Sequence, residues 1–483
     1  MTSTADDIPL RMFNTMTRQV AVFAPAVPPE VGIYSCGPTV YADQHIGNMR
    51  TYVFADTLKR VLTWKGYRVR HVINITDVGH LTSDADEGDD KLEVAARRLR
   101  RNAWEIAEMY TRDFKTDLAR LRIIEPDIWC KATDHIQHMI KFAEVLDAGG
   151  WCYPLPSGLY FDTSRAAGYG TLARLDLAGQ QAGARVDVVE GKRHPADFAV
   201  WRTTAPGENR QMEWDSPWGR GAPGWHLECS VMSIRYLGSH FDIHTGGVDH
   251  IPIHHTNEIA QSEAYLADGK PWVRWWLHGE FINLSGAKIS KSTGGGVLVG
   301  DLIDRGYHPL VYRYLLLQSH YRSQAEFTWT AIDSAQSGLR RLLDRYSGAR
   351  EGAVDEPLSV AAAEHVAAFD RAISDDMNTP KALAVVAAAS RDVRLAGSDL
   401  TGIARRFDQV LAVGLTDLAP ADLDLKRRDA ALGDEEVAAL VARRNAARAA
   451  RDFAASDQIR DQLAAAGVAV EDHPGAESTW RWR

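Results

Sequence analysis

Residues 31–76 constrain the fold of this chain more than any other stretch. The apolar run at 31–34 has the composition of a buried strand, and a Cys-Gly-Pro turn ends it. Residues 50–66 then carry apolar side chains at helical spacing, and residues 67–76 again have the pattern of a strand. Strand, loop, helix and strand within about 45 residues make a βαβ unit. Its first loop lies where open α/β sheets bind ligands.

That loop ends in His45-Ile46-Gly47-Asn48, just before the predicted helix. Backbone N–H groups and the dipole at the start of a helix attract a phosphate, and a His and a small Gly suit its approach. We therefore predict a phosphate-binding loop at the edge of a Rossmann-like parallel sheet.

The composition is that of an ordinary globular chain of two to four domains: 483 residues, 45% hydrophobic and 25% charged. No run of 18 apolar residues occurs, so we expect no membrane span. The N-terminus is acidic and lacks the apolar core of a signal peptide. With only four cysteines in so long a chain, a reducing compartment is favoured, and we expect a cytoplasmic protein.

The net charge of −9 hides local basic clusters. Four arginines fall within residues 97–101, and four more fall within residues 443–451. Solvated helix faces are the simpler interpretation of either cluster. A local basic patch that binds nucleic acid is the alternative.

The remainder of the chain divides by composition. A long helical stretch is predicted over about 91–121. Glycine and proline become frequent in 151–224, which we interpret as an insertion between two halves of the sheet. The later units are helices over 302–346, a linker at 349–358, an Ala-rich helical bundle over 359–413, a second linker at 417–434, two short helices at 435–449 and 453–466, and a hairpin over 468–482.

Four dispersed residues form a candidate metal site. His254 and Glu258 are four apart, so on a helix they share a face and can bind one ion. Cys36 and Cys229 could add two thiolates, which completes a plausible ligand set for Zn²⁺. The cysteines lack the short spacing typical of zinc sites, and buried free cysteines are common, so the residues alone leave both interpretations open.

Two motifs carry a resemblance to a known family. His45-Ile46-Gly47-Asn48 resembles the HIGH signature of class I aminoacyl-tRNA synthetases. Residues 288–292, KISKS, resemble their KMSKS signature and follow in the right order, about 240 residues later. Cys36, nine residues before His45, narrows the resemblance to the cysteinyl-tRNA synthetases.

The resemblance implies a role for the candidate metal residues. In that family one zinc ion lies at the floor of the amino-acid pocket, and the matching positions here are intact. A substrate thiolate adds to such a zinc ion, whereas a serine hydroxyl is a much poorer ligand, so editing is unnecessary. The implied ligands are Cys36, Cys229, His254 and Glu258.

The resemblance also implies an ATP site and an amino-acid site. His45 and Asn48 contact the phosphates of ATP, which enters with Mg²⁺, and Lys288 and Lys291 neutralise charge as pyrophosphate leaves. Asn48 replaces the final His of the signature, so that contact comes from an uncharged amide. The residues implied at the amino acid or adenylate are Thr39, Thr76 and Trp225, for which a turn hydroxyl, a strand hydroxyl and a core aromatic are the structural alternatives.

Near the C-terminus the resemblance implies recognition of an anticodon. Phe453 stands where an aromatic ring stacks on a base, and an Arg with two acids can contact base edges. The implied residues are Arg448, Phe453, Asp457 and Asp472. The expected domains are a catalytic domain at 1–310 with an insertion at about 120–224, a helical stem-contact region at 311–350, a helical bundle of DALR type at 351–418, and an anticodon-binding domain at 435–483.

The sequence therefore predicts an enzyme that activates L-cysteine with ATP and transfers it to the 3′ end of tRNA(Cys), acting as a monomer without a membrane. The nearest enzymatic rival is the cysteine ligase of mycothiol biosynthesis, a relative that lacks the anticodon domain; Glu258 and residues 435–483 favour the synthetase. The other rival is a synthetase-like protein that binds without catalysis, which has no reason to keep the intact motifs together.

Overall fold

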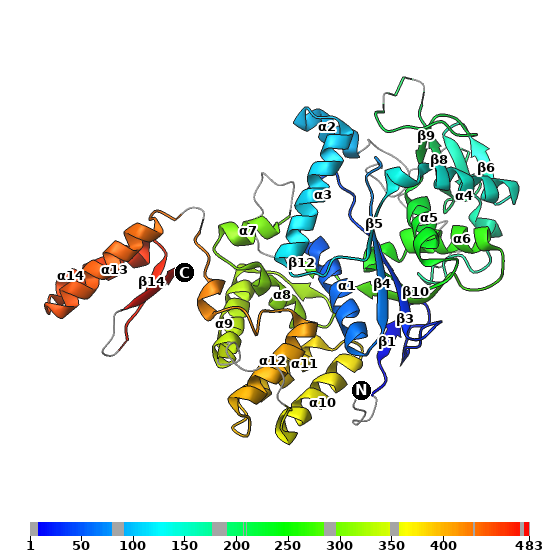
Figure 1. Cartoon of the computed structure of the whole chain (residues 1–483). Coiled ribbons are helices and arrows are strands. Elements are labelled where there is room, and N and C mark those ends of the chain that lie inside the picture. The colour runs from blue at the N-terminus through cyan, green and yellow to red at the C-terminus, as the bar shows by residue number, and fades with distance from the viewer. Residues whose placement is uncertain are drawn as a thin grey trace.

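The computed structural model describes residues 8–79, 91–175, 191–205, 207–208, 210–284, 296–347, 357–427, 430–473 and 478–482. Its centre is a five-stranded parallel sheet in the order β11-β10-β3-β4-β5, with helices on both faces (Figure 1). The predicted α/β fold is therefore confirmed. The strands of this sheet are β3 (Glu30–Ser35), β4 (Arg68–Ile75), β5 (Ile128–Lys131), β10 (Phe241–Gly247) and β11 (Val273–Gly279).

Two hydrophobic cores cover the two faces of the sheet. Helix α1 packs on one face, where Val31 and Ile33 of β3 join its apolar side. Helices α4, α5 and α6 cover the other face, which Tyr34 of β3 enters. Every residue of β10 is buried, as parallel sheets with two covered faces require. These helices are α1 (Ile46–Trp64), α4 (Ile136–Ala148), α5 (Trp225–Leu237) and α6 (His254–Leu266).

A separate antiparallel sheet, in the order β6-β7-β8-β9, lies between β5 and β10 in the sequence. Strand β5 falls inside the range expected for the insertion, about 120–224, yet it pairs with β4 in the parallel sheet. The antiparallel sheet begins only at Cys152. The strands outside the parallel sheet in this half are β1 (Arg11–Asn14), β2 (Gln19–Val22), β6 (Cys152–Leu155), β7 (Gly158–Phe161), β8 (Phe198–Thr203) and β9 (Gly221–Pro223).

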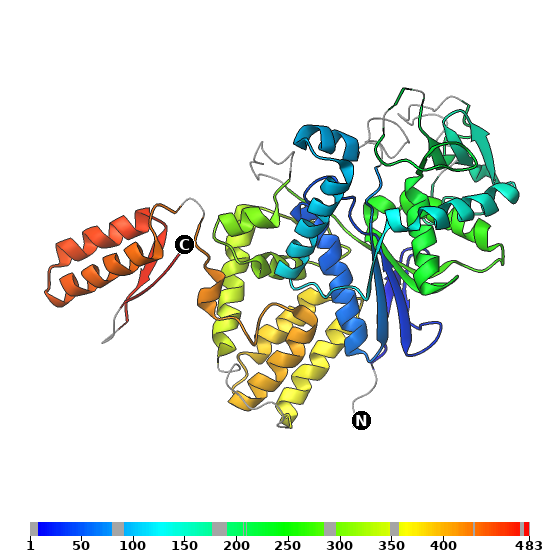
Figure 2. The same ribbon diagram turned by 45° about the horizontal axis from the view of Figure 1, so that its top comes forward.

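The helical stretch expected over about 91–121 is two helices, α2 (Lys91–Leu99) and α3 (Ala103–Arg120). Arg100 has a φ of 53°, a left-handed conformation that no α-helix can continue. Asn102 then caps α3 by accepting a hydrogen bond from the N–H of Glu105 at 2.8 Å. The two helices form a hairpin that projects from the domain of the parallel sheet (Figures 1 and 2).

Helices follow the sheet domain, and a buried ion pair joins them to it. The guanidinium of Arg313 on α8 donates to Asp56 of α1 at 2.5 Å and to the carbonyl of Leu411 at 2.7 Å, with both charged side chains fully buried. Breaking such a pair costs about 3–5 kcal/mol, so α8 and the end of α12 are held firmly against α1. The elements are β12 (Ile282–Asn283), α7 (Val299–Asp304), α8 (Pro309–Leu317), β13 (Ala325–Glu326), α9 (Trp329–Arg345), α10 (Val360–Ser374), α11 (Thr379–Ala389) and α12 (Gly397–Leu411).

The C-terminal unit has a small core of its own. Val437, Leu463 and Trp482 lie in that core, which does not merge with the larger ones. The unit stands apart from the rest of the chain in both views (Figures 1 and 2). Its elements are α13 (Asp434–Ala449), α14 (Phe453–Ala465), β14 (Val468–Glu471) and β15 (Thr479–Trp482). Within the described residues, every helix is too short or too polar to cross a membrane.

The buried His71 of β4 predicts a pH dependence of stability. Burial, aided by Lys59, lowers the pKa of His71 to about 3, and its ring bonds to Ser35 Oγ at 2.8 Å. In the unfolded chain a histidine binds a proton near pH 6.5, so stability is lost as the pH falls from 6.5 towards 3. For one proton, each pH unit below 6.5 lowers the free energy of unfolding by about 1.4 kcal/mol. At pH 5 the loss is therefore about 2 kcal/mol.

Urea unfolding at pH 7 and pH 5 measures this loss in the free energy of unfolding. The unchanged protein should lose about 2 kcal/mol more than a His71→Gln variant, whose amide cannot ionise. An equal loss in the two proteins would contradict the assignment of a neutral, buried imidazole.

Candidate active site and metal centre

Parallel pairing gathers the ends of β3 and β4 at one edge of the sheet. Thr39 and Thr76 form a β-bridge there, just beyond the two strands. A side chain at Gly37 would place its Cβ 1.5 Å from the carbonyl oxygen of Asn74, so only glycine fits. The N–H of Gly37 also donates to Asn74 Oδ1 at 2.8 Å. The loop that carries Cys36 is therefore fixed directly over the end of β4.

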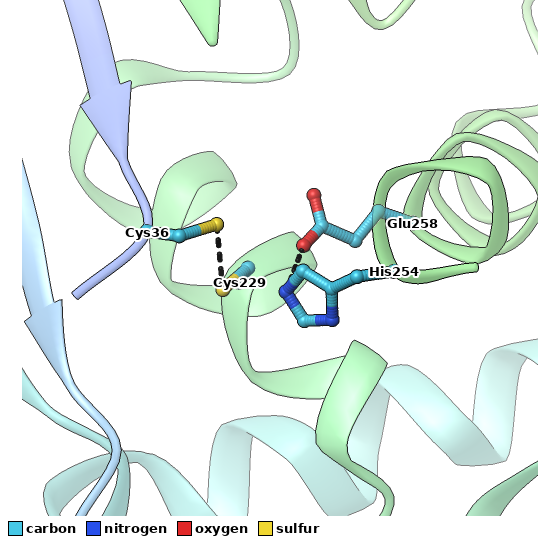
Figure 3. A group of neighbouring side chains, drawn as sticks. All are labelled: Cys36, Cys229, His254 and Glu258. Atoms are coloured by element: carbon cyan, nitrogen blue, oxygen red, sulfur yellow. Dashed lines mark hydrogen bonds and ion pairs between the residues drawn. The ribbon is translucent and has the colours of Figure 1, made fainter. Parts of the chain in front are cut away.

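The structure brings the four predicted metal ligands together (Figure 3). Their ligand atoms all lie within 4.8 Å of one another, and all four side chains are buried. Cys36 follows β3, Cys229 lies on α5, and His254 and Glu258 share the first turns of α6. The two sulfur atoms are 3.9 Å apart, and His254 Nε2 lies 2.6 Å from Glu258 Oε1.

The donor set fits a metal ion. Glu258 Oε1 is buried, and its nearest polar neighbour is His254 Nε2, with which it forms an ion pair when the imidazole is protonated. Two ligand atoms so close together can share one cation. Two sulfurs, one imidazole nitrogen and one carboxylate oxygen are ligands that Zn²⁺ accepts.

The electrostatics of the cluster agree with that interpretation. Burial opposes ionisation of Cys36, but the hydrogen bond from Cys229 and the nearby His255 lower the pKa of Cys36 overall. Burial raises the pKa of Cys229, and the Cys36 sulfur adds to the rise. One thiolate therefore forms readily and the second does not, unless a positive ion binds between them.

His254 and Glu258 of α6 instead stabilise each other's charge. Burial would lower the pKa of His254, but Glu258 and Cys36 raise it to about 10. Burial would raise the pKa of Glu258, but His254 and His244 hold it below its usual range. Without a metal ion, a proton on His254 compensates the buried negative charge; a cation can take its place.

Further histidines surround the cluster, and no role was predicted for them from sequence. His244 bonds to Glu258 Oε2 at 2.7 Å, His255 lies 3.4 Å from Cys36 Sγ, and His278 bonds to His255 at 2.7 Å. Such outer contacts orient metal ligands. Cys36, His244, His255 and Glu258 also form a ligand-like group, but His244 and His255 do not line the cavity described next. The sequence held a signal for two of these histidines. His255 follows His254 directly, and His244 lies in a buried strand.

A cavity of about 780 Å³ opens beside the cluster and contains most of the other predicted residues. Trp225 forms part of its wall and stacks on His254 with ring centres 4.1 Å apart. The predicted residues that line the cavity are Cys36, Thr39, His45, Asn48, Thr76, Trp225, Cys229 and His254. A larger, mainly apolar cavity of about 1000 Å³ borders β1, β2 and α6 and contains none of them.

The start of α1 faces the same cavity. His45 Nδ1 accepts from the N–H of Asn48, and Asn48 Oδ1 accepts from the N–H of His45, each at 3.2 Å. Asn48 therefore closes a capping box, a local role that explains an amide at this position. Burial lowers the pKa of His45, which favours the neutral ring.

Lys288 and Lys291 lie outside the described residues, but the chain on both sides of them contacts the start of α1. Before them, the side chain of Ile282 lies close to Gly47: a Cβ added to Gly47 would be 3.7 Å from Ile282 Cγ2. After them, the carbonyl of Val297 accepts from the N–H of Ile46 at 2.8 Å.

The residues predicted for the anticodon all lie in the C-terminal unit. Asp472 accepts two hydrogen bonds from Arg444, at 2.7 and 2.9 Å, and also contacts Arg448. Asp457 pairs with Arg460 at 3.0 Å. The ring of Phe453 is 65% exposed, so it is free to stack on a partner. Arg444, which sequence reasoning did not select, holds Asp472 in place.

Comparison with known proteins decides the family. Residues 22–337 match the model of the "tRNA synthetases class I (C) catalytic domain", and residues 425–481 match that of the "Cysteinyl-tRNA ligase anticodon binding domain". Cysteine–tRNA ligase 1 of Burkholderia lata is 50% identical over 469 residues, which cover 97% of this chain and 96% of that protein. The chain belongs to the cysteine–tRNA ligase family.

More distant relatives agree. A cysteine–tRNA ligase of Thermus thermophilus is 42% identical over 484 residues, covering 98% of this chain and 99% of the relative. Among solved structures, Mycobacterium tuberculosis methionyl-tRNA synthetase in complex with methionyl-adenylate matches with a TM-score of 0.53 at 16% identity. It covers 80% of this chain and 88% of that one, and at this identity it shows the fold alone.

The cluster predicts that the purified protein binds one zinc ion per chain. Cys229→Ser removes a thiolate ligand and should weaken zinc binding by about 100-fold or more. Cys152→Ser, at a free cysteine outside the cluster, is the matched control and should retain the metal. Elemental analysis and competition with a chromogenic chelator measure both, and equal zinc content in the two variants would exclude Cys229 as a ligand.

Proposed function

We propose that this chain activates L-cysteine with ATP to form cysteinyl-adenylate and transfers the cysteinyl group to the 3′ end of tRNA(Cys). One observation carries the proposal. Three members of the buried group of two cysteines, a histidine and a glutamate (Cys36, Cys229 and His254) line the same cavity as the helix start at His45 and Asn48. A thiol-binding group beside a nucleotide-binding group is what the activation of cysteine requires.

The metal cluster would select the amino acid. A bound zinc ion supplies a soft Lewis acid that takes the thiolate of cysteine as a ligand and discriminates against serine. Cys36, Cys229, His254 and Glu258 would hold that ion. Trp225 restricts the space over His254, and the hydroxyls of Thr39 and Thr76 would orient the bound amino acid or adenylate.

The start of α1 would bind ATP, which carries Mg²⁺. The helix dipole at that end favours phosphate, and Nε2 of neutral His45 and the side-chain NH₂ of Asn48 can donate hydrogen bonds there. The cysteine carboxylate then attacks the α-phosphorus, forming an acyl–phosphate bond as the bond to pyrophosphate breaks. Lys288 and Lys291 would neutralise the charge that develops on pyrophosphate, so positioning and electrostatics supply most of the rate.

The C-terminal unit would recognise the tRNA. Phe453 would stack on an anticodon base, while Arg448, Asp457 and Asp472 would contact base edges. The domain limits that accompany this proposal are a catalytic domain at 1–310, a stem-contact region at 311–350, a helical bundle at 351–418 and an anticodon-binding domain at 435–483.

The family match disfavours the alternatives. A cysteine ligase of mycothiol type lacks the anticodon segment, whereas residues 425–481 match that domain here. The intact ligand cluster argues against a binding protein without catalysis. We propose a cytoplasmic monomer.

Pyrophosphate exchange followed by charging of total tRNA tests the proposal directly. Exchange should depend on cysteine and not on serine, and only tRNA(Cys) should then be charged. Exchange without charging of any tRNA, together with activity on an amino sugar, would replace the synthetase with the mycothiol-type ligase.

Lys291→Ala should slow adenylate formation by about 100- to 1000-fold, because a lost transition-state contact of this kind costs about 2.7–4 kcal/mol. The affinity for cysteine should change little, since the metal cluster is intact. Single-turnover kinetics measures both quantities, with Lys270→Ala as a control at a lysine outside the site cavity. Weaker cysteine binding at an unchanged rate would remove Lys291 from the ATP site.

A chain that ends at residue 433 should separate the two half-reactions. The metal cluster and the start of α1 remain, so cysteine-dependent pyrophosphate exchange should continue near the full rate. Charging should become poor, mainly through a raised KM for tRNA. The point variant Phe453→Ala should reproduce part of the loss, since stacking contributes about 1–3 kcal/mol per base. Equal charging by the full and shortened chains would mean that this unit does not bind the anticodon.

A further inference from the structure

The α2–α3 hairpin forms one wall of the site cavity. Lys91, Ala95 and Arg98 of α2 line the cavity together with His45 and Asn48. Any group that enters the cavity beside α2 must therefore pass this hairpin, which projects from the catalytic domain (Figure 2).

The end of α2 and the turn that follows carry a concentrated positive charge. Arg97, Arg98, Arg100 and Arg101 are all exposed. Among the described residues, no acidic side chain forms an ion pair with any of them, whereas Arg120 at the far end of α3 pairs with Asp117. Two arginines in the last turn of a helix can offset its dipole, but Arg100 and Arg101 lie beyond that turn. Stabilisation of the helix dipole therefore accounts for Arg97 and Arg98 but not for Arg100 and Arg101.

The same hairpin exposes apolar side chains. Val94 and Leu99 are each 39% exposed, and the ring of Trp104 is 47% exposed. Positive charge mixed with an exposed aromatic ring is the surface that single-stranded nucleic acid prefers, because phosphates contact the cations and bases stack on the ring.

We propose that the α2–α3 hairpin binds the single-stranded 3′ end of the tRNA and guides its terminal nucleotide into the cavity. This inference rests on the proposed function, since only a tRNA-charging enzyme must bring that nucleotide to the adenylate. Arg97, Arg100 and Arg101 contact the phosphates of the unpaired nucleotides, and Trp104 stacks on one of their bases. This surface is separate from the one in the C-terminal unit that is proposed to contact the anticodon.

The test removes three charges that do not line the cavity, in a triple variant Arg97→Gln, Arg100→Gln and Arg101→Gln. The matched control removes three exposed charges from α4, α5 and β11, as Lys141→Gln, Arg235→Gln and Arg274→Gln. Cysteine-dependent pyrophosphate exchange should stay within about twofold of the unchanged protein in both variants, because activation needs no tRNA. The KM for tRNA should rise about tenfold or more in the hairpin variant only.

Salt dependence and a shortened tRNA identify the contact. Losing three single-strand phosphate contacts should lower the slope of log affinity against log salt by about 2. With a tRNA that lacks its unpaired 3′ nucleotides, the hairpin variant and the unchanged protein should bind equally. Trp104→Ala should show the same pattern with a smaller loss.

Each other result overturns the inference. An unchanged KM in the hairpin variant would leave the arginines as a solvated helix face, and an equal loss with full and shortened tRNA would place the contact elsewhere on the tRNA. If the unchanged protein charges no tRNA, the proposed function itself fails, and a pyrophosphate-exchange assay that still responds to cysteine separates that result from misfolding.

Discussion

The parallel pairing of β3 with both β4 and β10 is the constraint on which the site depends. It brings the loop after β3, which carries Cys36, against the end of β4 and beside the segment between β10 and α6. The register leaves so little room that residue 37 must be glycine. Cys36 and Glu258, more than two hundred residues apart, become neighbours because the strands that precede them are adjacent.

Without a bound cation, the cluster assembled in this way relies on a proton on His254 to compensate its buried negative charge. One carboxylate and two thiols lie buried together, and the pKa shifts of Cys36 and Cys229 oppose each other. Protonated imidazole compensates part of the charge, and His244 and His255 hold the outer sides of the ligands. A buried group of this kind is costly to maintain unless binding repays it, which is why the cluster points to function rather than to packing.

Rigid contacts connect the helical region to the site. Arg313 joins α8 to α1, the helix whose start faces the cavity. Asp376, between α10 and α11, has a φ of 54° and accepts hydrogen bonds from Arg322, Tyr321 and the N–H of Phe13. The segment 320–326 in turn pairs with β12, which leads towards Lys288 and Lys291. The helical region, which includes the proposed stem-contact region at 311–350, is thus linked to the sheet and to α1 through defined contacts.

The sequence by itself determined the βαβ unit and the pairing of His254 with Glu258, because strand patterning and i, i+4 spacing are local. It also determined the helix after the first strand, although that helix begins at Ile46 and not at about residue 50 as expected. It also located the C-terminal unit, which has a separate small core. Tertiary structure alone decided the rest. It placed Cys36 beside Cys229, set His244, His255 and His278 around the ligands, and engaged Asp472 with Arg444. It also moved β5 out of the expected insertion into the parallel sheet. These depend on which strands pair and which helices pack, and no local pattern records contacts between residues that are distant in the chain.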